Sequence, residues 1–113
     1  MNTLFAVACL RTGIVLELLG PGDQMLDAEQ LAAILPQLFN APATDWGAIF
    51  SRLGAEAGDA FQDIVLVTDA RVHVVQRLRE PAETALIAVA EGTTNVGLVL
   101  SSVRAKVAEI EAR

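Results

Sequence analysis

The sequence predicts an α/β protein of one domain, residues 1–113, with the element order β-β-α-β-β-β-α. Three observations lead to this class. Apolar runs occur in pairs joined by short polar turns, as in β-hairpins. A further run at 84–90 is apolar on both faces, which is typical of a strand inside a sheet. Two other segments, 27–39 and 94–113, space their apolar residues three or four apart, as amphipathic helices do.

The first predicted hairpin joins the runs TLFAVACL at 3–10 and IVLELL at 14–19 through Arg11-Thr12-Gly13. The first run is apolar on both faces, so we expect its strand in the sheet interior. The second carries Glu17 and is expected near an edge. The single cysteine, Cys9, lies in the first run and is interpreted as a small buried hydrophobe.

A helix is expected over 27–39, with Asp27 at its cap and a stripe made by Leu31, Ile34, Leu35 and Leu38. Pro36 predicts a kink or break, because proline removes a backbone hydrogen bond and clashes with the preceding turn. After a stop at 40–43, Thr44 or Asp45 is expected to cap a second helix.

That second helix would carry Trp46, Ile49, Phe50 and Leu53 on one side. Apolar residues at helical spacing usually pack in a core. In a chain with 4% aromatic residues, however, an exposed Trp would be a good interface anchor. Trp46 and Phe50 are therefore candidates for partner binding, with core packing as the alternative.

The second predicted hairpin, residues 61–78, turns at Thr68-Asp69-Ala70-Arg71, where Asp69 is well placed to stabilise the turn. Alternation along the second strand separates Val72, Val74 and Leu78 from Arg71, His73, Arg77 and Arg79. The basic group is either a solvated face or a docking patch for an acidic partner. His73 itself is interpreted as a surface residue.

The loop at 91–95 resembles a phosphate-binding loop only in part. Gly92 and Gly97 bracket four residues, but Leu98-Val99 stand where Lys-Ser/Thr is required. We therefore expect the loop to start a helix that Thr94 or Asn95 caps. The apolar stripe of that helix consists of Val96, Val99, Val103, Val107 and Ile110.

The composition limits the classes of function. Hydrophobic residues make up 53% of the chain, and the mean hydropathy is +0.47. No apolar run reaches the ~18–20 residues that span a bilayer, and no secretory signal is present, so we expect a cytoplasmic protein without membrane insertion. Self-association would cover the apolar residues that exceed what a single core of this size needs. A net charge of -6 excludes a nucleic-acid footprint, which needs clustered basic residues.

Chemical signatures are weak. A metal site would have to combine the single histidine with distant carboxylates. A serine triad built from Ser101, His73 and Asp69 lacks the G-x-S-x-G elbow. We therefore expect no enzyme activity and no cofactor.

In this order the elements resemble the roadblock (dynein light-chain) family of the bacterial or archaeal type. Three segments carry the resemblance. FAVACLRTGIVLEL at 5–18 is similar to the opening hairpin of the family. IVLVTDARVHVVQRL at 64–78 is similar to its second hairpin. LIAVAEGTTNVGLVLSSVRAKV at 86–107 is similar to its last strand, Asn-apolar-Gly turn and closing helix.

The resemblance implies a mostly antiparallel sheet of order 2-1-5-4-3 with helices on both faces. It implies a homodimer formed through the third strand, with the middle helices alongside. The interface residues carried over are Leu31, Ile34, Leu35, Leu38, Ile64, Val65, Leu66 and Val67.

The function implied by the resemblance is a non-catalytic adaptor and a platform for a small Ras-like GTPase. The alternatives are a scaffold in another signalling complex, for instance beside a sensor kinase, and a small-molecule sensor.

Two features depart from the family pattern. The family usually has a helix before its first strand, whereas here the first strand begins near Met1. The middle helix is also interrupted at Pro36 and at 40–43. Since the usual GTPase-docking surface includes the middle helices, the second departure bears directly on that function.

Overall fold

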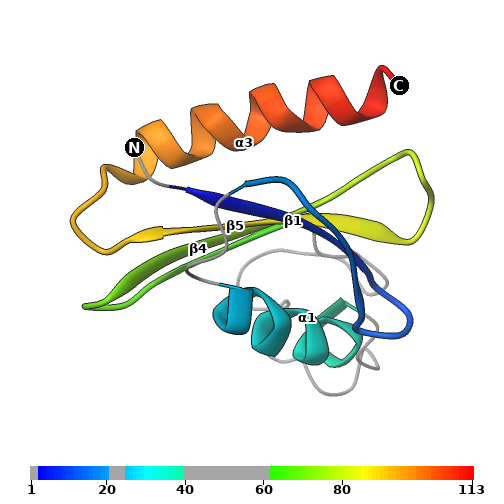
Figure 1. Cartoon of the computed structure of the whole chain (residues 1–113), viewed down its shortest axis with the longest axis horizontal. Coiled ribbons are helices and arrows are strands. Elements are labelled where there is room, and N and C mark those ends of the chain that lie inside the picture. Colours follow the sequence, from blue (N-terminus) through cyan, green and yellow to red (C-terminus); the bar gives the residue numbers. More distant parts are fainter. Residues whose placement is uncertain (1–2, 21–24, 40–61) are drawn as a thin grey trace, which may run out of the picture.

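A computed structural model describes residues 3–20, 25–39 and 62–113. Its five strands form one antiparallel sheet in the order β2-β1-β5-β4-β3. Helix α1 lies on one face of the sheet and helix α3 on the other (Figure 1). The elements are β1 (Leu4–Cys9), β2 (Val15–Leu18), α1 (Met25–Phe39), β3 (Asp63–Val67), β4 (Arg71–Arg77), β5 (Thr84–Glu91) and α3 (Val96–Glu111). This confirms the predicted class, element order and sheet order.

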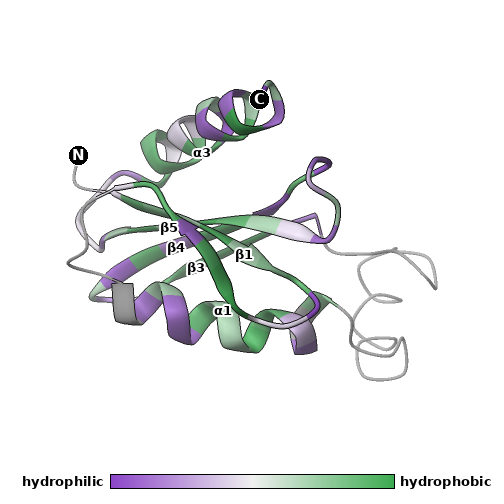
Figure 2. Ribbon diagram, turned by 45° about the vertical axis from the view of Figure 1, so that its right-hand side comes forward, coloured by the Kyte–Doolittle hydropathy of each residue, from purple (hydrophilic) through white to green (hydrophobic). Residues whose placement is uncertain are grey.

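Strand β5 lies at the centre of the sheet, between β1 and β4. All its residues from Thr84 to Ala90 are buried, because helices cover both of its faces. Figure 2 shows hydrophobic colouring along much of β5 and β1. The interior positions predicted for both strands are therefore confirmed, and so is the edge position of β2, the strand that carries Glu17.

Two apolar cores lie on opposite faces of the sheet. The core under α1 joins helix residues such as Leu35 to Ile87 and Val75. The core under α3 joins Val103 and the other buried residues of this helix to strand side chains that point to the opposite face of the sheet. The buried stripe of α3 is Val99, Val103, Val107 and Ile110, as the sequence predicts.

Helix α1 ends at Phe39 as predicted but begins earlier, at Met25, so Asp27 lies within the first turn instead of capping the helix. Of the kink or break expected at Pro36, the break does not occur, because the helix continues through the proline. Leu35 and Phe39 are both buried on either side of the proline. Burying side chains of this size contributes about 1.5–3 kcal/mol each, which offsets the ~3 kcal/mol that proline costs inside a helix.

The β3–β4 turn is held by Thr68. Its backbone N–H donates to the carbonyl oxygen of Arg71 at 2.9 Å, and its hydroxyl accepts from the Arg71 N–H at 3.0 Å. Gly92 packs against the same turn, and its N–H donates to the Ala70 carbonyl at 3.0 Å. A Cβ at Gly92 would lie 2.5 Å from the Asp69 carbonyl oxygen, so the loop before α3 can approach the turn only with glycine.

The loop at 91–95 starts helix α3, as predicted. Asn95 is the N-cap residue, and its side-chain oxygen accepts from the N–H groups of Gly97 and Leu98 at 2.8 and 3.4 Å. These are donors that a helix start leaves without partners inside the helix. The asparagine therefore has a structural role that accounts for its place in the loop.

Asn95→Ala is expected to lower the free energy of unfolding by about 1 kcal/mol, the typical cost of losing an N-cap acceptor. Urea unfolding followed by far-UV circular dichroism measures the change. Asn95→Asp is the matched control, because it keeps the acceptor oxygen and places negative charge at the helix N-terminus. Equal stability of the alanine variant and the unmodified chain would contradict the capping role.

Candidate protein-interaction surfaces

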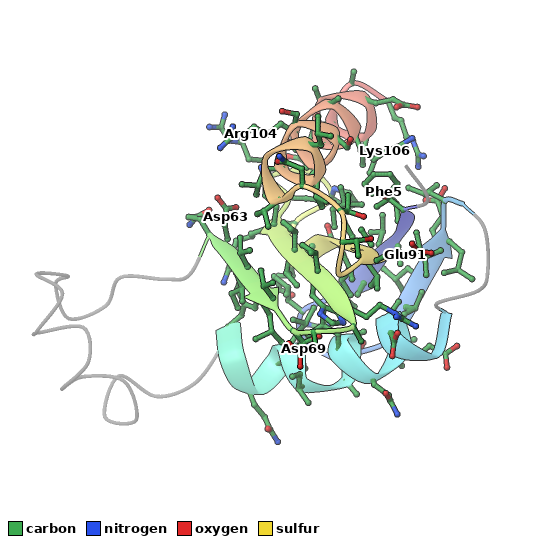
Figure 3. All side chains as sticks on the ribbon, turned by 90° about the vertical axis from the view of Figure 1, so that its left-hand side faces the viewer. Phe5, Asp63, Asp69, Glu91, Arg104 and Lys106 are labelled. Carbon is green, nitrogen blue, oxygen red and sulfur yellow. The ribbon has the colours of Figure 1, made fainter. Side chains whose placement is uncertain are left out.

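Strand β3 forms one edge of the sheet and presents apolar side chains to solvent. Val65, Leu66 and Val67 are 44%, 49% and 54% exposed, while Ile64 packs partly against the core under α1. The register with β4 is regular from Asp63 to Val67. Figure 3 shows the strand at the border of the sheet, with Asp63 at its beginning. Long, regular apolar edges are the ones most prone to pair with another strand.

Strand β2, at the other edge, carries features that discourage strand pairing. It has four residues, and the register shifts between Val7 and Ala8 of its neighbour. Glu17 projects from it and forms an ion pair with Arg113 at 3.0 Å. A short strand, an irregular register and a charge are the usual means of protecting a sheet edge. Within the described part of the chain, β3 is thus the edge that lacks this protection.

The hydrogen-bond pattern shows which groups of β3 face outward. Thr68 N–H donates to the Arg71 carbonyl, and Arg77 N–H donates to the Gln62 carbonyl. Hydrogen-bonded pairs alternate along an antiparallel ladder, so Ile64 and Leu66 bond to β4. The backbone N–H and C=O groups of Asp63, Val65 and Val67 point away from the sheet, and no residue of 3–20, 25–39 or 62–113 is hydrogen-bonded to them.

The predicted interface residues of helix α1 have different surroundings. Leu31 and Leu35 are buried in the chain's own core, since they face the sheet. Ile34 points outward and is 45% exposed, so it is accessible to a second molecule. The side chain of Leu38 lies outside the described part of the structure, as do Trp46 and Phe50 and the helix predicted to carry them.

The basic face of β4 does not form the open patch considered from the sequence. Strand β4 presents its odd-numbered residues to the same sheet face as Val75 of the core under α1, and two of its arginines contact residues of α1 there. Arg71 Nε pairs with Asp27 Oδ2 at 3.2 Å, and the Arg77 guanidinium lies 5.0 Å from the centre of the Phe39 ring. Both arginines therefore contribute contacts between α1 and the sheet.

His73 and Arg79 also differ from their predictions. His73 is half-buried, with a buried Nδ1 atom, and lies opposite Leu66 of β3. It is thus not the surface residue expected. Arg79 lies beyond the end of β4, where its backbone N–H donates to Glu111 of α3 at 3.0 Å. The four basic-face residues consequently do not share one free surface.

The described residues contain no group of three or more His, Cys, Asp or Glu side chains suited to hold a metal ion. Among the described helices, none has the length and apolar character needed to cross a membrane. Cys9 is half-buried, and a hydrogen bond from the Thr12 side chain lowers the pKa of its thiol.

A second apolar surface, which was not predicted from the sequence, lies beside β2. Leu16 is 59% exposed and Leu18 is 40% exposed, and Ile14 in the preceding turn is 59% exposed. Glu17 was the available signal, because a charge inside an apolar run indicates that one face of the strand meets water. It did not reveal that neighbouring leucines remain uncovered.

Neither a scan against protein-family models nor a search of curated proteins found a match for the chain. Solved structures do match. A Roadblock/LC7 domain from Streptomyces avermitilis is 16% identical, with a TM-score of 0.68 over 99% of this chain and 85% of that one. MglB of Myxococcus xanthus is 13% identical, with a TM-score of 0.63 over 95% and 78%.

The gliding protein MglB from Thermus thermophilus is 20% identical, with a TM-score of 0.53 over 83% of this chain and 64% of that one. These similarities extend over most of the chain at low identity, so they concern its fold. They agree with the sheet order and with the helix on each face. The chain has the roadblock fold, as the resemblance of its sequence implied.

Proposed function

We propose that the protein is a non-enzymatic homodimeric adaptor or regulator in the cytoplasm, and that it serves as a platform for a small Ras-like GTPase. The observation that carries the proposal is the unprotected β3 edge, with exposed Val65, Leu66 and Val67. A second copy of the chain is a natural occupant, because an isologous contact covers the same patch on both molecules at once.

Antiparallel pairing of two β3 strands would extend the sheet across both protomers. The two-fold axis would then run perpendicular to the sheet, so both α1 helices would lie on the same side. The outward-facing Ile34 has exposed Gln30 and Gln37 four and three residues away on the same helix face, and it would contribute to a surface shared by two chains. A surface of this kind suits a partner larger than a peptide.

The GTPase as partner is supported by the resemblance of the sequence to the roadblock family and by the fold. It is compatible with the acidic charge of -6, which favours protein partners over nucleic acid. Helix α1 continues through Pro36, so one of the two interruptions expected in the middle helix is absent, whereas the other, at 40–43, lies outside the described residues.

The proposal is tested by mixing the full chain with the small Ras-like GTPases of the same organism, each loaded with GDP or with a non-hydrolysable GTP analogue. Size-exclusion chromatography with light scattering should detect a complex of one dimer with a GTPase, and the complex should depend on the nucleotide. A variant that cannot dimerise should lose the complex. Binding to none of these GTPases would overturn the GTPase assignment. The proposed homodimer would then be tested separately, by the molar mass that light scattering gives for the chain alone.

A further inference from the structure

The face of the sheet that carries α3 is only partly covered. Helix α3 packs on β4 and β5, whereas α1 packs on β5, β1 and β2. On the α3 side, the outer part of β1 and β2 is therefore covered mainly by side chains. Phe5 is one of them, and Lys106 of α3 reaches over its ring at 5.4 Å (Figure 3).

A groove of about 410 Å³ lies in this region, beside the last turn of α3. Its volume falls within the ~300–1,000 Å³ of typical binding pockets. The apolar part of its lining comes from Val7, Leu16, Pro81 and Ile110. Val7 and Ile110 are almost fully buried, whereas Leu16 is 59% exposed. The groove thus has an apolar floor and an uncovered leucine at its border.

The charged part of the lining is mostly acidic. It consists of Glu17, Glu80, Glu111 and Arg113, which is three negative charges against one positive. Arg113 is already paired with Glu17 at 3.0 Å, and Glu111 accepts the backbone N–H of Arg79. Two negative charges therefore remain in excess beside the apolar floor.

We infer that this groove is a second docking surface, and that its occupant is a short amphipathic segment of another protein, with apolar anchors flanked by Lys or Arg. The apolar floor matches one or two aliphatic side chains, and the acidic border attracts basic flanks through complementary charge. An amphipathic helix presenting anchors at helical spacing to such a groove is a common mode of recognition.

A second copy of the chain is a poorer occupant of the groove, because the charged lining is mostly acidic and the chain itself has 14 acidic against 8 basic residues, whereas the groove favours basic flanks. The groove also lies on the sheet face opposite α1 and away from β3, since β2 and β3 are at opposite edges. Occupation of the groove is therefore independent of the proposed dimer and GTPase surface, and each can be tested without the other.

The test uses two designed peptides of about 15 residues, roughly four helical turns. Both carry the same Leu/Ile stripe, one with Lys and the other with Glu at the flanking positions. Fluorescence anisotropy with the full chain should give a Kd at least about tenfold lower for the Lys peptide at low salt. The preference should shrink as salt screens the charges. Methyl NMR should show the largest shifts at Val7, Leu16 and Ile110.

Matched variants locate the site. Leu16→Lys should weaken Lys-peptide binding at least about tenfold, whereas Leu98→Lys should not, although both leucines are 59% exposed. Glu80→Lys should weaken binding, whereas Glu91→Lys, at the other end of β5, should leave it unchanged. Equal binding of the two peptides, no saturable binding up to about 1 mM, or an unchanged Kd in Leu16→Lys would each overturn the inference.

Discussion

Val65→Pro is expected to convert the proposed homodimer to a monomer at micromolar concentration while the fold is retained. The Val65 N–H points away from β4, as the ladder bonds on either side of it establish. Proline removes that outward donor but leaves the bonds between β3 and β4 in place. Edge strands tolerate proline where the missing N–H faces solvent.

The expected loss is large because a two-fold contact repeats each change. Each protomer loses one hydrogen bond, with a net value of about 1 kcal/mol. The facing acceptor is left unsatisfied, at a further ~1–3 kcal/mol. Together the two copies should weaken dimerisation at least about 100-fold. Sedimentation equilibrium over a concentration series measures this directly.

Leu18→Pro is the matched control for the opposite edge. Leu18 is 40% exposed against 44% for Val65. Its N–H also points outward, since Leu19 N–H bonds inward to the Phe5 carbonyl. This variant should remain a dimer. A monomeric unmodified chain, or loss of the dimer in Leu18→Pro alone, would show that β3 is not the dimer edge.

Ile87→Ala is expected to destabilise the protein by about 2–5 kcal/mol, the range for substituting alanine for a buried isoleucine. Ile87 is completely buried on the central strand β5 and packs in the core under α1. It lies opposite Ala6 of β1 and Val75 of β4, so both of these β-strands constrain the backbone around it. The cavity can therefore collapse only in part. Urea unfolding measures the loss at a fixed protein concentration, because the proposed dimerisation would make the apparent stability depend on concentration.

Ile14→Ala removes the same atoms at a position that is 59% exposed and should change stability by less than about 0.5 kcal/mol. Similar losses at positions 14 and 87 would contradict the assignment of Ile87 to a rigid core. The pair separates the effect of packing from that of isoleucine itself.

The sequence by itself determined the local structure. Val99, Val103, Val107 and Ile110 recur at helical spacing, and these are the residues that α3 buries. Thr84–Ala90 is apolar on both faces, and it forms the central strand. Thr94 or Asn95 could be named as the cap because unpaired N–H groups at a helix start require an acceptor, and the structure assigns this role to Asn95. Each of these signals acts between residues close together in the chain.

The tertiary structure decided which surfaces remain free. From the strand pattern alone, Arg71 and Arg77 could face water or a partner. Only the packing of α1 shows that they meet Asp27 and Phe39. In the same way, the groove beside β2 and the last turn of α3 remains exposed because α3 packs on β4 and β5. Periodicity assigns a residue to a face, but what covers that face depends on elements distant in sequence, whose packing no local pattern encodes.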